Sequence, residues 1–307
     1  MRCLRKIICL LLSVTLILSG CGRTAKKSRE NQGVQEAETF RIVTSFYPLY
    51  IIMMNLTEDV PGIALINMAS PQTGCLHDYQ LRPKDLICLE DADLFVINGG
   101  GMEGFLADAM ETYEDLEVAC AMDAFSEEQL LPGGEEDEGE NPHTWMNPRL
   151  YKEEVIYLAG ILAKKDAAHK EQYETNAVAY EGRIDTLICG MEKERKGGQE
   201  QGCILLHESF AYLMDRLDIP VEQILDVEKD SGFSARELRE LIDEVKEISN
   251  GIIVSDRQYS GQVARLLSEE TGFSVVYLDS CVSGEYEKDA YLDSMKNNIR
   301  EWENAEK

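Results

Sequence analysis

Short apolar runs alternate with helix-forming segments along most of this chain of 307 residues, and the alternation restricts the folds open to it. Each apolar run has the length of one buried strand, and each segment between runs has room for a helix. Strands that alternate with helices in this way form parallel sheets. The predicted strands are residues 40–44, 63–68, 94–98, 116–120, 204–206, 223–227, 251–254 and 274–278.

One long helix-forming stretch interrupts the alternation. It begins at Pro148 and runs to residue 197 without another proline, and Gly197-Gly198 ends it. Proline is favoured in the first turn of a helix and glycine after its end, so we predict one long helix, with at most a bend. The predicted fold is therefore α/β with two lobes, each with a mostly parallel sheet flanked by helices. The N-terminal lobe is residues 40–147, the linker helix is residues 148–197, and the C-terminal lobe is residues 198–307.

The N-terminus has the pattern of a targeting segment. Basic residues precede the apolar run 7–18, which is too short to span a bilayer, and Leu18-Ser19-Gly20-Cys21 follows. This phrase resembles a bacterial lipobox, so we predict a lipoprotein signal peptide over residues 1–20 and lipidation of Cys21. An ordinary signal peptide with a chance cysteine is the alternative. Residues 21–39 are polar and predict a flexible tether. The signal peptide and the lipid together predict a protein outside the cytoplasm that is anchored to the cell membrane.

The chain is strongly acidic, with a formal net charge of -27. Such a surface repels nucleic acids and anionic substrates and is compatible with a cationic ligand. A solvated acidic surface without a ligand is the simpler interpretation. Residues 135–140 add an acidic, glycine-containing loop, which either attracts cations weakly or is a solvated surface loop.

Nine cysteines are present, two of them within the predicted signal peptide and one at the predicted lipid site. None forms a CxxC pair, which argues against a zinc ribbon. An extracytoplasmic location permits disulfides, and Cys203 with Cys281 is the first pair to test, because both lie near the ends of predicted strands.

Three of the four histidines lie within short structured phrases. His207 follows the apolar run 204–206, and Asp279 follows another apolar run, 275–278. Ligands of open α/β sheets bind at the carboxyl ends of the strands, and His77 and His143 offer two further candidates from the first lobe. Three imidazoles and one carboxylate make a tetrahedral or near-tetrahedral metal site. His169 lies on a polar helix face, so we predict a structural or surface role for it.

These phrases resemble the motifs of the solute-binding lipoproteins of zinc/manganese ABC uptake systems. The resemblance implies a monomer that binds its metal in a cleft between the lobes and delivers it to an ABC permease in the membrane. It also implies that His77, His143, His207 and Asp279 are the metal ligands. Asn141 and Asn147 stand where the family has acids. The phrases are His77-Asp78-Tyr79-Gln80-Leu81-Arg82-Pro83, Asn141-Pro142-His143-Thr144-Trp145-Met146-Asn147-Pro148, His207-Glu208-Ser209-Phe210 and the acid Asp279 after Val275-Val276-Tyr277-Leu278.

A third nitrogen ligand, His207, favours Zn²⁺ over Mn²⁺, and manganese remains the alternative cargo. A zinc-dependent hydrolase with Glu208 as its base is a second hypothesis. No HExxH motif is present, and four protein ligands would close the site, so we expect metal carriage and no enzyme activity. Cell adhesion is a third interpretation, for which no residue pattern marks a protein-binding face.

Overall fold

The computed structural model describes residues 39–70, 76, 79–110, 112–133, 139–194, 202–225, 227, 234–249, 251–259 and 261–305. The predicted signal peptide, Cys21, all but the last residue of the predicted tether, and His77 lie outside the described residues. Most of the acidic loop at residues 135–140 also lies outside them.

The first half of the chain forms a four-stranded parallel sheet, in the order β2-β1-β3-β4. Val43 in the central strand β1 lies opposite Ile66 on one side and Phe95 on the other. Val43 and Phe95 are fully buried, as expected for strands covered on both faces. The strands are β1 (Phe40–Thr44), β2 (Ile63–Asn67), β3 (Leu94–Ile97) and β4 (Val118–Cys120).

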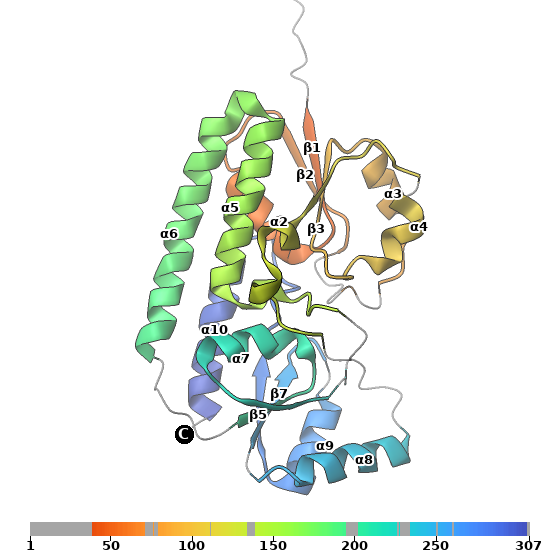
Figure 1. The fold of residues 1–307 in the computed structure, drawn as a ribbon, viewed down its shortest axis with the longest axis vertical. Coiled ribbons are helices and arrows are strands. Elements are labelled where there is room, and N and C mark those ends of the chain that lie inside the picture. Colours follow the sequence, from red (N-terminus) through yellow and green to blue (C-terminus); the bar gives the residue numbers. More distant parts are fainter. Residues whose placement is uncertain are drawn as a thin grey trace, which may run out of the picture. The chain divides into compact units, whose positions relative to one another are not determined.

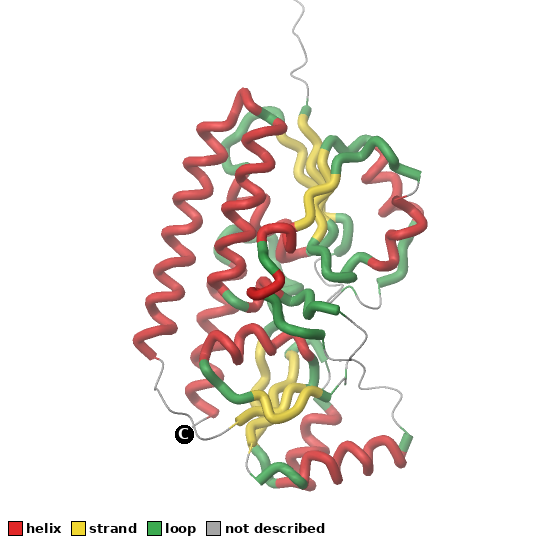
Figure 2. The backbone as a smooth tube through the Cα atoms, viewed as in Figure 1, coloured by secondary structure: helices red, strands yellow, loops and turns green. Residues whose placement is uncertain are grey.

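The second half repeats this arrangement, with a second parallel sheet in the order β6-β5-β7-β8. Ile252 in β7 pairs with Cys203 in β5 and with Ser274 in β8. Figure 2 shows the strands gathered in two separate groups with helices around each, so the predicted α/β fold with two parallel sheets is confirmed. The strands are β5 (Gly202–Leu205), β6 (Val221–Ile224), β7 (Gly251–Asp256) and β8 (Ser274–Leu278).

Helices cover both faces of each sheet. One hydrophobic core extends from the first sheet to the second and includes side chains of α2, α5, α6, α7 and α10. Two smaller cores lie under α3 and α4 on the first sheet and under α8 and α9 on the second (Figure 1). The helices are α2 (Tyr47–Leu56), α3 (Pro83–Glu90), α4 (Ala107–Met110), α5 (Pro148–Lys165), α6 (Lys170–Glu194), α7 (Ala211–Leu217), α8 (Ala235–Lys246), α9 (Gln262–Thr271) and α10 (Ala290–Ala305).

The long helical stretch turns back on itself instead of running on as one helix. It divides into α5 and α6, which lie side by side in Figure 1, and α6 is the long helix of the fold. Asp166 ends α5 with φ -116° and ψ 71°. Its Oδ2 accepts a hydrogen bond from Tyr173 at 2.8 Å and lies 2.6 Å from His169 Nδ1. One carboxylate thus stabilises the turn, and His169 has the structural role predicted for it.

The two halves are tied together by hydrogen bonds between buried and partly buried groups. The fully buried Trp145 donates from Nε1 to the Ser280 carbonyl at 2.8 Å, and its own carbonyl accepts from Tyr291 at 2.8 Å. On α2, Tyr47 donates to the Glu285 carbonyl and Asn55 to the Lys288 carbonyl. Thr39–Lys307 accordingly pack as one unit.

Cys203 and Cys281 are both free thiols. The disulfide between them that the sequence suggested is therefore not formed. Cys203 pairs with Ile252 in β7, and Ile252 pairs on its other side with Ser274, the first residue of β8. Cys203 therefore lies near the amino ends of the strands. Cys281 follows the carboxyl end of β8, so the two thiols lie toward opposite ends of the strands.

Within the described residues, no helix has the length and apolar character needed to cross a membrane.

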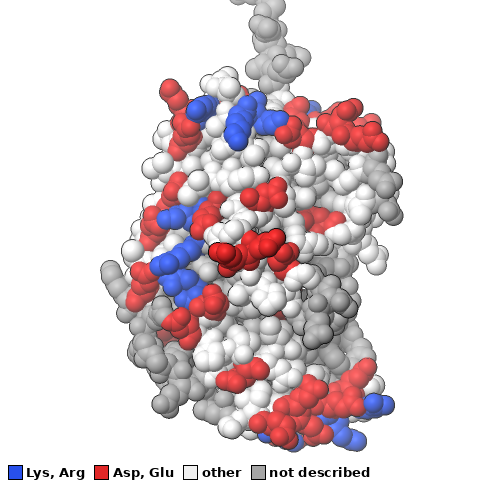
Figure 3. Space-filling model, viewed as in Figure 1, with Lys and Arg blue, Asp and Glu red and all other residues white. Residues whose placement is uncertain are grey.

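Acidic side chains are spread over the face drawn in Figure 3, and a group of them with interspersed basic residues lies over α8. The helix contains Glu237, Glu240, Asp243 and Glu244 beside Arg236, Arg239 and Lys246. Arg236 pairs with Glu240 one turn later, at 2.8 Å. This part of the acidic surface is therefore a solvated helix face on which some acids are paired with basic residues.

Candidate metal centre

Two of the predicted ligands, His143 and His207, lie against each other. Their ring centroids are 5.1 Å apart and the ring planes are nearly perpendicular, at 88°. Two imidazoles bound tetrahedrally to one zinc ion at Zn–N distances of about 2.0–2.1 Å would have ring centres roughly 5 Å apart. Both rings are almost completely buried. The pair therefore has the spacing of two ligands of one metal ion.

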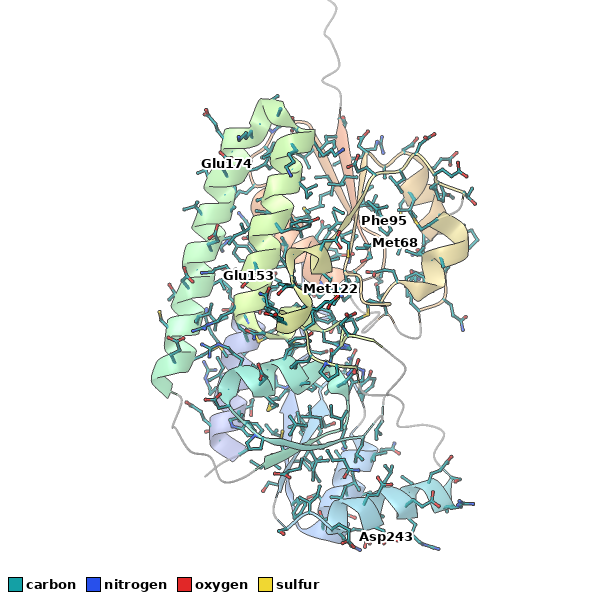
Figure 4. The ribbon with its side chains drawn as sticks, in the orientation of Figure 1. Met68, Phe95, Met122, Glu153, Glu174 and Asp243 are labelled. Atoms are coloured by element: carbon teal, nitrogen blue, oxygen red, sulfur yellow. The ribbon has the colours of Figure 1, made fainter. Side chains whose placement is uncertain are left out.

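His143 is positioned by the end of strand β3. Asn98, which follows β3, donates from Nδ2 to the Pro142 carbonyl at 2.8 Å. Gly100 has a positive φ of +58°, and a Cβ there would lie 2.6 Å from Met122 Sδ and 3.1 Å from Pro142 Cβ. Met122, labelled in Figure 4, follows β4. The segment before α5 thus depends on a side-chain amide and a glycine at the carboxyl edge of the first sheet.

The side chain of Asn141 determines how the His143 ring is used. Asn141 Oδ1 accepts the His143 backbone N–H at 3.0 Å and lies 2.9 Å from His143 Nδ1. An amide oxygen is only an acceptor, so Nδ1 carries the proton and Nε2 is the ring nitrogen left available to a metal ion. Trp145, whose ring centroid lies 5.1 Å from that of His143, packs beside the ring.

His207 lies at the carboxyl end of β5, as predicted, with Leu206 between the strand and the histidine. It begins a short 3₁₀ turn at Glu208–Phe210, and its Nδ1 accepts the backbone N–H of Ser209 at 3.0 Å. A neutral imidazole that accepts at Nδ1 carries its proton on Nε2. The two histidines therefore have opposite tautomers in the metal-free protein.

We expect zinc to reverse the tautomer of His207 and to leave that of His143 unchanged. Coordination through Nε2 moves the His207 proton to Nδ1, which can then no longer accept from the Ser209 amide. The Ser209 hydroxyl is buried without a partner among the described residues and offers an acceptor for that proton. Long-range ¹H–¹⁵N spectra of the four histidines, recorded with and without zinc, measure both tautomers. The same His207 tautomer in both states would contradict coordination through Nε2.

Asp279 follows β8, and both carboxylate oxygens accept hydrogen bonds. The Cys281 backbone N–H donates to Oδ1 at 2.8 Å and the Ser294 hydroxyl to Oδ2 at 2.9 Å. Each oxygen keeps a second lone pair for a metal ion. Ser280, the residue after Asp279, accepts a hydrogen bond from Trp145, which lies two residues after His143. This bond links the segments that carry Asp279 and His143.

The described residues do not complete a metal site by themselves. Among them, no three His, Cys, Asp or Glu side chains come close enough together to hold a metal ion. The structure thus pairs His143 with His207 and does not group Asp279 with them. His77 lies outside the described residues. The complete ligand set stays a prediction.

Asp256 is an acid that the sequence analysis missed. It ends β7 and is buried, and its carboxylate accepts from the backbone N–H of Gln258 at 3.0 Å and from Gln258 Nε2 at 2.8 Å. Burial raises its pKa, and the hydrogen bonds from Gln258 and Ser280 oppose that rise. An acid at the carboxyl end of a strand was the signal that selected Asp279, and the same rule applied to residues 251–256 finds Asp256.

The buried carboxyl group of Glu154, on α5, contacts Thr144, the residue after His143. Its Oε1 accepts the Thr144 hydroxyl at 2.7 Å, and Oε2 has no partner among the described residues. Burial raises the pKa of Glu154 from 4.5 to about 8. The folded protein therefore holds this group as a neutral acid at pH 7.

We expect stability to fall between about pH 4.5 and pH 8 because of Glu154, and Glu154→Gln to remove this contribution. Over that range the unfolded chain releases the proton and the folded chain keeps it, so each rise in pH favours unfolding. At pH 8 the variant should be more stable by roughly 2–4 kcal/mol, and at pH 5 nearly equal to the wild type. Urea unfolding of both proteins at pH 5, 7 and 8 measures this. Parallel pH profiles would mean that Glu154 ionises normally.

Comparison with known proteins places the chain in a family. Residues 42–305 match the family described as zinc-uptake complex component A, periplasmic. The chain belongs to this family. The high-affinity zinc uptake system protein ZnuA of Bacillus subtilis (strain 168) is 28% identical over 301 residues, which cover 92% of each protein. The manganese-binding lipoprotein MntA of Halalkalibacterium halodurans is 25% identical over 295 residues, 93% of each.

Solved structures show the same fold. The SBP FpvC from Pseudomonas aeruginosa in complex with Mn²⁺ has a TM-score of 0.77 at 22% identity, over 87% of this chain and 98% of that one. A mutant of the laminin-binding adhesin Lmb from Streptococcus agalactiae has a TM-score of 0.72 at 24% identity, over 87% and 99%. This chain therefore shares the fold of both solved structures.

Proposed function

We propose that this protein captures zinc outside the cytoplasm and delivers it to an ABC permease. The pairing of His143 and His207 carries the proposal, because it joins one imidazole from each half of the chain at the spacing of shared ligands. We assign His77 as the third nitrogen ligand and Asp279 as the oxygen ligand. Lipidation of Cys21 would hold the protein at the membrane beside its permease, and it would act there as a monomer.

Zinc is the first candidate cargo and manganese the second. Imidazole nitrogens suit zinc, whereas carboxylate and water oxygens suit manganese. The name of the relative from Halalkalibacterium halodurans supports keeping manganese as the alternative. Competition between Zn²⁺ and Mn²⁺ for the purified chain tests the choice. We expect one equivalent of zinc to displace manganese, and retention of manganese under excess zinc would reverse the assignment.

We also propose that the protein does not catalyse hydrolysis. A catalytic zinc needs an open coordination position and a general base. Glu208 was the base candidate, but its Oε1 lies 3.4 Å from Nδ1 of His143, the ring nitrogen that carries the proton. Turnover of ester or peptide substrates by the zinc-loaded protein would contradict this.

A further inference from the structure

The carboxylate of Glu208 approaches the proton-bearing nitrogen of His143. Oε1 of Glu208 lies 3.4 Å from His143 Nδ1, and the Glu208 side chain is only 14% exposed. Glu208 directly follows His207 in the chain. The dipeptide His207-Glu208 therefore contributes two groups. His207 is a candidate ligand, and the carboxylate of Glu208 faces His143, the candidate ligand from the first half.

Asn141 fixes the relative position of the two partners. Its Nδ2 donates to the backbone carbonyl of Glu208 at 3.1 Å, while its Oδ1 faces His143 Nδ1 at 2.9 Å. Because the amide donates in one direction and accepts in the other, its orientation is defined. The nearest acceptor of the His143 ring proton is thus neutral, and the nearby negative charge belongs to Glu208.

We propose that Glu208 is a positioning residue for His143, whose carboxylate stabilises the Nδ1–H when Nε2 coordinates the metal. The inference rests on the proposed function, since it takes His143 to be a ligand. Coordination draws electron density from the ring and makes the Nδ1–H more positive. A carboxylate facing that proton strengthens the ligand, and loss of such a partner typically lowers metal affinity about 10–100-fold.

The test compares zinc affinities at one pH, by competition with a chelator, for the wild type, Glu208→Gln, Asn141→Asp and the double variant. Glu208→Gln keeps the shape of the side chain and removes its charge, so affinity should fall about 10–100-fold. Asn141→Asp returns a carboxylate to His143 Nδ1 from the other side. Glu208→Gln should therefore cost much less in the Asn141→Asp background, and the double variant should recover most of the lost affinity. A purely structural role of Glu208 would not be rescued from position 141.

Glu174→Gln is the matched control, because Glu174 is exposed on α6 and pairs only with Lys170 in the contacts of the described residues (Figure 4). It removes the same charge at an exposed position outside the candidate site and should leave zinc affinity unchanged. Equal melting temperatures of the metal-free proteins show that the variants fold. If Glu208→Gln binds zinc like the wild type while His143→Ala does not, the role of Glu208 is wrong and the proposed function stands. Failure of Asn141→Asp to rescue would also overturn it. If His143→Ala itself keeps full affinity, the proposed function fails.

Discussion

Replacing His143 or His207 by alanine should lower zinc affinity by more than about 100-fold, since the loss of a ligand's partner alone costs about 10–100-fold. Each substitution removes one nitrogen from a pair whose ring centroids are 5.1 Å apart. A water molecule would then have to take the coordination position that the histidine leaves. Chelator competition with the purified variants measures the change, and wild-type affinity in either variant would remove that histidine from the site.

His169→Ala is the control for both substitutions. His169 lies in the turn between α5 and α6, with Nδ1 2.6 Å from Asp166 Oδ2. Its loss should change the stability of the turn and not the affinity for zinc. A large loss of affinity would mean that the metal is bound through a different histidine from those assigned.

Trp145→Ala should destabilise the metal-free protein by about 3–5 kcal/mol, the usual cost of deleting a buried aromatic side chain. Trp145 is fully buried, packs edge-on against Phe46 at 5.1 Å and donates to the Ser280 carbonyl. The substitution therefore removes the packing beside His143 and one of the hydrogen bonds between the halves. Denaturant unfolding at pH 7 measures the loss.

Trp145→Phe separates the two contributions. It keeps an aromatic ring beside Phe46 and removes the indole N–H, which leaves the Ser280 carbonyl without its donor. That loss alone should cost about 1–3 kcal/mol. If Trp145→Ala cost less than about 1 kcal/mol, the ring would not be a structural support of the site.

Local patterns predicted most of the fold because each strand is an apolar run of its own. The predicted and observed limits agree for β1 (Phe40–Thr44) and β8 (Ser274–Leu278). The turn between α5 and α6 was not predicted. Helix-forming residues continue through it, and the break at Asp166 depends on contacts with residues that follow in α6. Side-chain contacts of Asp166 with His169 and Tyr173 overrode local helix propensity there.

The candidate site was predictable to the extent that it obeys sheet topology. The rule that ligands lie at the carboxyl ends of strands selects His207 from the sequence alone, and in the folded chain this residue lies against His143. The contacts of Glu208 with His143 and with Asn141 were not predictable. They join segments from different halves of the chain, and no periodicity in the sequence records such a contact.

The most direct test of the account is a crystal structure of the zinc-loaded protein. We predict one zinc ion with nitrogen ligands from His77, His143 and His207 at about 2.0–2.1 Å and one carboxylate oxygen from Asp279. We also predict Glu208 beside His143 Nδ1 in the loaded site. A zinc ion bound instead by the carboxylates of residues 135–140, or coordinated without His143 and His207, would contradict this prediction.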